Sequence, residues 1–179
     1  MTTSNTNEEL NETTNPTIFF TMGDCSLGSI LVAQSERGVC SILMGEDPAR
    51  LAQDLRTRFP KASLIHDQSH EELVTQVAGF IKKPGAALDL PLDVRGTAFQ
   101  QLVWDAVQRI PAGSTASYSE IARRIGVPGA VRAVAQACGA NTLAVAIPCH
   151  RVIRNDGSLS GYRWGIERKR ALLAREAHA

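Results

Sequence analysis

The sequence lacks three features that would each indicate a different class of protein. No apolar run approaches the roughly 20 residues of a membrane-spanning helix. The first residues, MTTSNTNEELNETTN, lack the basic-then-apolar order of a secretory signal peptide. The cysteines at positions 25, 40, 138 and 149 form no CxxC pair, which argues against a disulfide framework and a zinc ribbon. We therefore expect a cytoplasmic protein with reduced thiols, no membrane association and no metal.

Net charge is also nearly absent, at +1, but its distribution along the chain is uneven. Residues 1–94 carry 7 Lys/Arg and 13 Asp/Glu, which gives −6, whereas residues 95–179 carry 12 and 5, which gives +7. The second half is therefore a candidate binder of a polyanion such as nucleic acid. A solvated surface with basic groups on all sides is the alternative, and charge alone does not decide between them.

The first half predicts a flexible tail followed by a small α/β domain. Residues 1–16 are rich in Asn, Thr and Glu and are interpreted as the tail. Three β-branched or aromatic runs separated by glycine-containing turns predict an antiparallel meander: Thr17–Met22, Ser29–Ala33 and Val39–Met44. Helices are expected after Asp47-Pro48 and after the capping-box pattern Ser69-x-x-Glu72. Leu88–Val94 fits an edge strand or extended connector, so we place a domain boundary near Val94, with domains at 17–94 and 95–179.

The second half predicts a helix-turn-helix. The capping boxes Thr97-x-x-Gln100 and Ser117-x-x-Glu120 each start a helix, and a third helix is expected from Pro128 after the turn at Gly126. Its inward positions are predicted to be Val131, Val134, Ala135 and Cys138. Its outward positions are predicted to be Arg132, Ala133, Gln136, Gly139 and Ala140. One cation among small residues suits close approach to a sugar-phosphate backbone better than base reading in the major groove, although many helical hairpins bind nothing.

The segment Pro148-Cys149-His150-Arg151 is the strongest candidate for chemistry. A thiolate is the reactive form of cysteine, and cationic neighbours or a paired imidazole lower the pKa of its thiol. The preceding proline fixes the local backbone and helps to hold the sulfur in place. An inert core cysteine is the alternative reading, and it is the one we give to Cys25, Cys40 and Cys138.

Several motifs stand in an order that resembles one family. RGTAFQQLVW, SYSEIA, AVRAVAQACGAN, IPCHRV, GSLSGYRWG and a final helix with LLAREA are similar to the O6-alkylguanine-DNA alkyltransferases, most closely to the carboxy-terminal half of bacterial Ada. The resemblance spans residues 17–179 and is densest after Arg95. It implies an α+β fold: an RNase H-like amino-terminal domain with a small antiparallel sheet and helices, then a mainly helical winged-helix-like domain.

The resemblance also implies a reaction. Cys149 would accept the alkyl group from O6-alkylguanine, or from O4-alkylthymine, in an irreversible displacement that each molecule performs once. His150 would be the water-linked base, Glu176 the carboxylate that orients its imidazole, and Tyr118 the proton donor to the purine. No cofactor is expected.

Double-stranded DNA is the implied partner, bound by a monomer through the minor groove with little sequence preference after the lesion is flipped out. Arg132 would fill the vacated stack, and the small residues Ala133, Ala137, Gly139 and Ala140 would allow close approach. The expected DNA-binding residues are Arg132, Ala133, Gln136, Gly139, Ala140, Tyr118 and Arg151.

The implied substrate pocket comprises Asn141, Cys138, Val152, Tyr162, Arg163 and Trp164. Asn141 would brace the turn between the recognition helix and the active site, and the Val152 carbonyl would hold the base. Trp164 is bulky where some relatives have glycine, which predicts a narrow pocket that prefers methyl to benzyl-sized groups.

Some family features have no counterpart in this sequence. The zinc-binding phosphotriester domain and the activator domain of full-length Ada are missing, so we expect no regulation through them. Three rival functions remain: a non-repairing lesion-binding protein, which in the family carries tryptophan in place of the cysteine; a sequence-specific helix-turn-helix regulator; and a Cys-His hydrolase that turns over acyl substrates.

Overall fold

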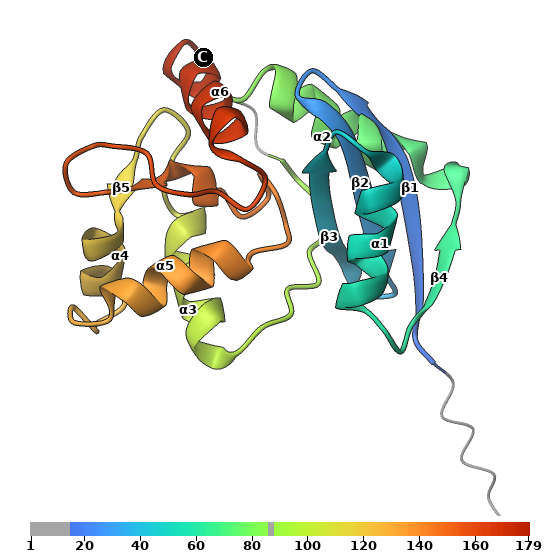
Figure 1. The fold of residues 1–179 in the computed structure, drawn as a ribbon, viewed down its shortest axis with the longest axis horizontal. Helices are drawn as coiled ribbons and strands as arrows, with labels where there is room; N and C mark the ends of the chain where they lie inside the picture. Colours follow the sequence, from blue (N-terminus) through green and yellow to red (C-terminus); the bar gives the residue numbers. More distant parts are fainter. Residues whose placement is uncertain (1–14, 86–87) are drawn as a thin grey trace, which may run out of the picture.

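The computed structural model describes residues 15–85 and 88–179, which form two lobes side by side (Figure 1). The predicted tail therefore lies, except for Asn15 and Pro16, outside the described residues. The amino-terminal lobe contains β1 (Thr17–Cys25), β2 (Gly28–Ser35), β3 (Gly38–Gly45), α1 (Pro48–Arg58), β4 (Ser63–His66), a 3-10 turn (Gln68–His70) and α2 (Glu71–Lys82). The carboxy-terminal lobe contains α3 (Ala98–Gln108), β5 (Ala116–Ser117), α4 (Tyr118–Arg124), α5 (Val131–Ala140), a second 3-10 turn (Cys149–Arg151), β6 (Val152–Ile153) and α6 (Ile166–Ala177). No helix in these described ranges is long and apolar enough to cross a membrane.

The amino-terminal lobe is built on a four-stranded sheet in the order β3-β2-β1-β4. The three predicted strands pair antiparallel as expected, but β4 adds to β1 in parallel, so the sheet is mixed rather than purely antiparallel. Strand β4 was not predicted, because it has only four residues and, apart from the partly buried Leu64, its side chains are exposed. Helix α1 lies in front of the sheet in Figure 1 and α2 behind it, which buries apolar side chains on both sheet faces.

The start of α2 differs from the prediction. Asp67, rather than Ser69, acts as the cap, and its carboxylate accepts a hydrogen bond of 2.8 Å from the Ser69 amide. The segment Gln68–His70 becomes a 3-10 turn, and α2 begins at Glu71 without a side-chain cap. The predicted capping box at Ser69 and Glu72 was therefore wrong, since Asp67 competes for the same amide.

An extended connector joins the lobes, as one of the two readings of residues 88–94 predicted. Val39 donates its amide to Pro91 O at 2.8 Å and accepts one from Asp93 at 2.8 Å, so the connector runs along the edge of β3. Helix α6 adds further links between the lobes: Arg168 Nε donates to Leu27 O, and Arg175 Nη1 donates to Ser26 Oγ, each at 2.8 Å.

The carboxy-terminal lobe contains the predicted helix-turn-helix, formed by α4 and α5. The capping boxes at Thr97 and Ser117 are both confirmed. Helix α5 starts at Val131 instead of Pro128, because residues 128 and 129 still belong to the turn. Two face assignments also differ from the prediction: Ala135, predicted to face inward, is exposed, whereas Ala137, predicted to lie on the DNA-facing surface, is buried.

Candidate active site

A braced loop brings Cys149 to the centre of the carboxy-terminal lobe. Asn141 ends α5, and its side chain donates to Ile147 O at 2.9 Å and accepts from the Leu143 amide at 2.8 Å. Within the loop Val145 has a φ of 60°, a conformation that a β-branched residue adopts only under constraint. Asn141 therefore braces the turn, as predicted, but it is buried and does not line the pocket.

The amino-terminal lobe holds the same loop from its other side. The Ile42 amide of β3 donates to Thr142 O at 2.8 Å, and Ile42 O accepts from the Ala144 amide at 3.1 Å. The backbone that leads to Cys149 thus pairs with an edge strand of the other lobe (Figure 1). This pairing fixes the sulfur relative to both lobes.

Three ionisable side chains form a buried cluster next to Cys149. His150 Nε2 lies 2.8 Å from Glu176 Oε1 on α6, and Arg151 donates to both carboxylate oxygens at 2.8–3.1 Å. Arg151 Nη1 also donates to Ile110 O at 2.7 Å. Burial alone would raise the pKa of Glu176, but the hydrogen bonds from His150 and Arg151 outweigh it and lower that pKa to about 2. Glu176 is therefore a carboxylate at neutral pH.

His150 is positioned to act as a base. Burial lowers its pKa, and the hydrogen bond to Glu176 only partly opposes this effect, so the imidazole is neutral at rest. Its Nδ1 atom is buried and has no hydrogen-bond partner among the described residues. Because Nε2 faces Glu176, Nδ1 is the nitrogen that remains free to accept a proton.

The resting thiol of Cys149 differs from the expectation. Its pKa is raised, first by the hydrogen-bonded neighbour Cys138 and then by burial, and the opposing effects of a hydrogen bond with Asn141 and of the charge of Lys169 do not cancel this rise. The sequence neighbours do not lower it as predicted, because Arg151 is committed to Glu176 and His150 is neutral. The thiolate must therefore form by proton transfer to a base.

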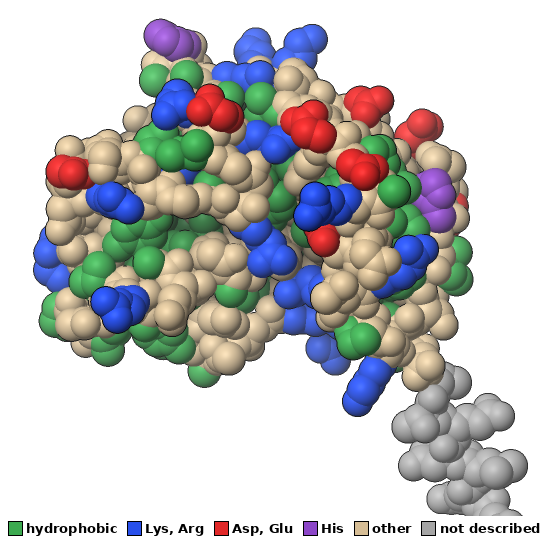
Figure 2. Space-filling model, in the orientation of Figure 1, with side chains coloured by type: hydrophobic (Ala, Val, Ile, Leu, Met, Phe, Trp, Pro, Cys, Tyr) green, Lys and Arg blue, Asp and Glu red, His purple; other side chains and the backbone are tan. Residues whose placement is uncertain are grey.

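A cavity of about 640 Å³ opens above the sulfur. Figure 2 shows it as a hollow with hydrophobic walls on the carboxy-terminal lobe. It is lined by Tyr118, Val131, Arg132, Ala135, Cys138, Gly139, Cys149, Arg154, Ser160, Gly161, Tyr162 and Arg163. Tyr118 and the recognition helix form one wall, and the loop before α6 forms the other. Tyr118 hydrogen-bonds Ser160, and burial raises its pKa, so it keeps its proton at neutral pH.

The structure brings most of the predicted site residues together but corrects two of them, Arg151 and Trp164, and adds a partner to a third, Val152. Arg151 is 7% exposed and held by Glu176, so its assignment to the DNA-binding set was wrong. Trp164 does not line the cavity; it packs edge-on behind Tyr162, with ring centroids 5.2 Å apart. Val152 O, expected to hold the base, accepts a hydrogen bond from Lys169 Nζ at 2.7 Å, although a carbonyl has room for a second donor.

Sequence reasoning missed Lys169. This lysine is completely buried on α6, where its ammonium lies 5.9 Å from the Tyr118 ring centroid as well as against Val152 O. A signal was available: Lys169, Leu172 and Glu176 share one face of the helix at spacings of three and four, and that face is apolar at Leu172. A lysine on a core-facing stripe indicates a buried partner.

The comparisons with known proteins agree with this geometry. Two family models match: the ribonuclease-like domain of 6-O-methylguanine DNA methyltransferase over residues 18–94, and its DNA binding domain over residues 98–178. The chain belongs to this family. Within it, the chain is 52% identical over 164 residues to the bifunctional transcriptional activator/DNA repair enzyme Ada of Escherichia coli, covering 91% of this chain and 46% of that protein. The chain therefore spans about half the length of the first of its curated relatives.

Two further members match along nearly their whole length. The inducible methylated-DNA--protein-cysteine methyltransferase of Bacillus subtilis is 36% identical over 170 residues, covering 94% of this chain and 95% of that protein. The crystal structure of Mycobacterium tuberculosis OGT in complex with DNA superposes with a TM-score of 0.76 at 38% identity, covering 89% of this chain and 93% of that one. A methyltransferase of this family thus has the same two-lobed fold.

Proposed function

We propose that the protein repairs alkylated DNA by moving the alkyl group of O6-alkylguanine, or of O4-alkylthymine, onto Sγ of Cys149. The observation that carries this proposal is the cavity with Cys149 at its base and the buried His150–Glu176 pair beside it. The similarity of the chain to methylated-DNA--protein-cysteine methyltransferases supports this assignment. We also propose that the chain divides near Val94, where the two family models meet.

The reaction begins with a proton transfer. His150 Nδ1 takes the Cys149 proton through one bridging water, which produces thiolate and imidazolium. Glu176 stabilises the imidazolium, but Arg151 already neutralises that carboxylate, so the proton remains on the imidazole. Arg151 is thus a positioning residue that keeps Glu176 ionised and in place.

The displacement then follows. The sulfur attacks the saturated carbon, the carbon–O6 bond breaks, and its electron pair leaves with the guanine oxygen while Tyr118 supplies a proton to the purine. The products are unmodified guanine and a thioether, and the thiol proton taken up by His150 replaces the proton that Tyr118 gave to the purine. Because water does not readily cleave a thioether, each molecule acts once.

The approach to DNA uses α5. The target base is extruded into the cavity at a cost of a few kcal/mol, and Arg132, which is exposed at its rim, occupies the gap in the stack. The exposed Gln136 and Gly139 and the half-buried Ala133 and Ala140 leave room for a minor-groove backbone. We propose a monomer with little sequence preference that works in the cytoplasm.

The decisive experiment is intact and peptide mass spectrometry after mixing the protein with an O6-methylguanine duplex. We expect one added methylene per molecule on the Cys149 peptide, and none in Cys149→Ala. A Cys149→Ala variant that still binds the duplex is the matched control. An unmodified wild-type protein that binds the lesion would instead establish a lesion-binding protein without repair.

A further inference from the structure

The amino-terminal lobe carries a local basic patch despite its net negative charge. Residues 55–66 contain Arg56, Arg58 and Lys61 and no acidic residue. Two of these cations lie in the last turn of α1, where they complement the helix dipole. The dipole does not explain why cations from two other segments gather at the same place.

Arg95 from the connector meets Arg58 at this point. Arg58 Nη2 lies 3.5 Å from Arg95 O, and both guanidinium groups lie 5.3 Å from the centroid of the Phe59 ring. Asp93 neutralises Arg95, but Arg58 has no carboxylate partner among the described residues, and its Nε is buried without a hydrogen bond. Burial lowers the pKa of Arg58, and the charges of Arg163 and Arg95 lower it further. In the free protein these like charges therefore lie close together, and their repulsion costs free energy.

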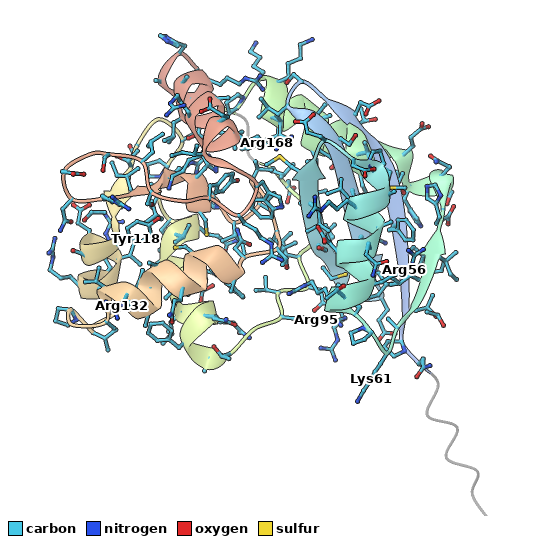
Figure 3. All side chains as sticks on the ribbon, in the orientation of Figure 1. Arg56, Lys61, Arg95, Tyr118, Arg132 and Arg168 are labelled. Atoms are coloured by element: carbon cyan, nitrogen blue, oxygen red, sulfur yellow. The ribbon has the colours of Figure 1, made fainter. Side chains whose placement is uncertain are left out.

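Arg163 connects this cluster to the active-site cavity. It lines the cavity, and its Nη1 donates to Gly139 O of the recognition helix at 3.2 Å. In Figure 3, Arg132, Arg95 and Lys61 succeed one another across the lower part of the face that carries the cavity. Figure 2 shows Lys and Arg at the left end of this path and again from its centre to its lower right end, and most of the acidic side chains on this face lie in its upper half, among further Lys and Arg. We call Arg58, Lys61, Arg95 and Arg163 the basic seam.

We propose that the basic seam binds the phosphate backbone of the duplex beside the flipped-out nucleotide, so that the amino-terminal lobe forms part of the DNA interface. The proposal rests on the DNA-repair function above, because the lesion in the cavity places the duplex across this face. A duplex carries one negative charge per about 1.7 Å of its axis, so a row of cations leading away from the cavity has phosphates within reach along its length. Bound phosphates would also relieve the repulsion around Arg58.

The test uses the variant Arg58→Gln/Lys61→Gln, with Lys82→Gln/Lys83→Gln at the end of α2 as a control of equal charge. Fluorescence anisotropy with an O6-methylguanine duplex that accommodates one protein measures affinity from 50 to 200 mM salt. Each lost phosphate contact lowers the salt slope by about 0.9. We expect the seam variant to lose about 1.8 of slope and the control to lose none. Arg58→Lys keeps the charge and should keep the slope.

Duplexes shortened on one side of the lesion locate the contact. The difference between wild type and the seam variant should disappear when one flank is removed and persist when the other is removed. Equal slopes for the seam and control variants, with folding verified by thermal melting, overturn the proposal. The proposal is also overturned if the seam variant keeps the salt slope of wild type but binds the duplex with a different stoichiometry, because the seam would then join two copies of the protein. Methyl transfer to wild-type Cys149 is measured in parallel, and its absence would refute the repair function instead.

Discussion

The two lobes bury different kinds of side chain. In the described part of the amino-terminal lobe the buried polar groups are hydroxyls of Thr21, Ser29, Ser35 and Ser41, and the charged group Asp93 lies in the connector. The carboxy-terminal lobe buries His150, Arg151, Lys169 and Glu176 around the short backbone segment that carries Cys149. Buried charges cost several kcal/mol each unless they are paired and hydrogen-bonded. The comparison shows that one lobe provides an apolar scaffold, whereas the other places costly groups where the reaction needs them.

Removing the negative charge from the buried cluster should have the largest effect. Glu176→Gln leaves Arg151 without its counter-charge, so we expect a loss of roughly 3–5 kcal/mol in the free energy of unfolding. Methyl transfer should slow at least about a hundredfold, because the imidazolium loses its stabilising partner. Urea denaturation and single-turnover kinetics measure the two effects. The matched control is Glu167→Gln on the same helix, where the carboxylate is 82% exposed and the change should stay within about 0.5 kcal/mol.

The same variant should reveal the pH dependence of the cluster. The pKa of Glu176 falls from its ordinary 4.5 to about 2 on folding, so its contribution is present above pH 4.5 and is lost as the pH falls toward 2. The contribution amounts to at most roughly 3 kcal/mol. The stability difference between wild type and Glu176→Gln should therefore shrink over this window. A difference that stays constant from pH 5 to 2.5 would contradict the assignment.

Truncating a core side chain of the amino-terminal lobe should lower the stability of the protein without slowing methyl transfer. Leu55 of α1 is fully buried against the sheet, and Leu55→Ala should cost about 2–5 kcal/mol. The transfer rate of the folded protein should remain that of wild type, since Leu55 touches none of the cluster. Leu102→Ala on α3, 55% exposed, should cost less than about 0.5 kcal/mol. A large loss of rate in folded Leu55→Ala would show that the lobes are coupled more closely than their contacts suggest.

The smallest effect concerns pocket size. Wild type should repair O6-methylguanine at least about tenfold faster than O6-benzylguanine, the scale on which pocket size discriminates. Trp164 supports Tyr162 from behind, so Trp164→Leu should reduce this preference by letting the Tyr162 ring retreat. Competition with mixed duplexes measures the ratio directly. Equal wild-type rates on the two adducts would refute the narrow pocket.

Local signals in the sequence predicted the start of a helix correctly where no nearby side chain competed with the capping residue. Thr97 and Ser117 each had a partner three residues later and no competitor, and both capping boxes formed. The predicted box at Ser69 did not form, because the Asp67 carboxylate accepts the hydrogen bond of the Ser69 amide that Glu72 would have accepted. Strand β4 was missed because its pairing with β1 is a tertiary contact that a short, mostly exposed segment does not encode locally.

In the candidate site, too, local sequence predicted some features and tertiary contacts decided the others. The motif around Cys149 and its resemblance to a family pointed to the reactive residues, but not to how their charges are shared. Arg151 looked like a free cation in the sequence, and only the position of α6 shows that Glu176 occupies it. Cys138 was expected in the pocket and lines the cavity, but nothing in the sequence indicated that it raises the pKa of Cys149. Such effects depend on distances between segments, which periodicity and spacing do not report.

The pairing of Ile42 with Thr142 and Ala144 has a consequence for protein engineering. If the chain is cut at Val94, the strand that aligns the loop before Cys149 and the loop itself belong to different fragments. Alkyl transfer would then report reassembly of the two fragments, because the nucleophile is aligned only when both are present. The covalent label would persist after the fragments separate, so a split version of this protein would record past encounters between any two partners fused to its halves.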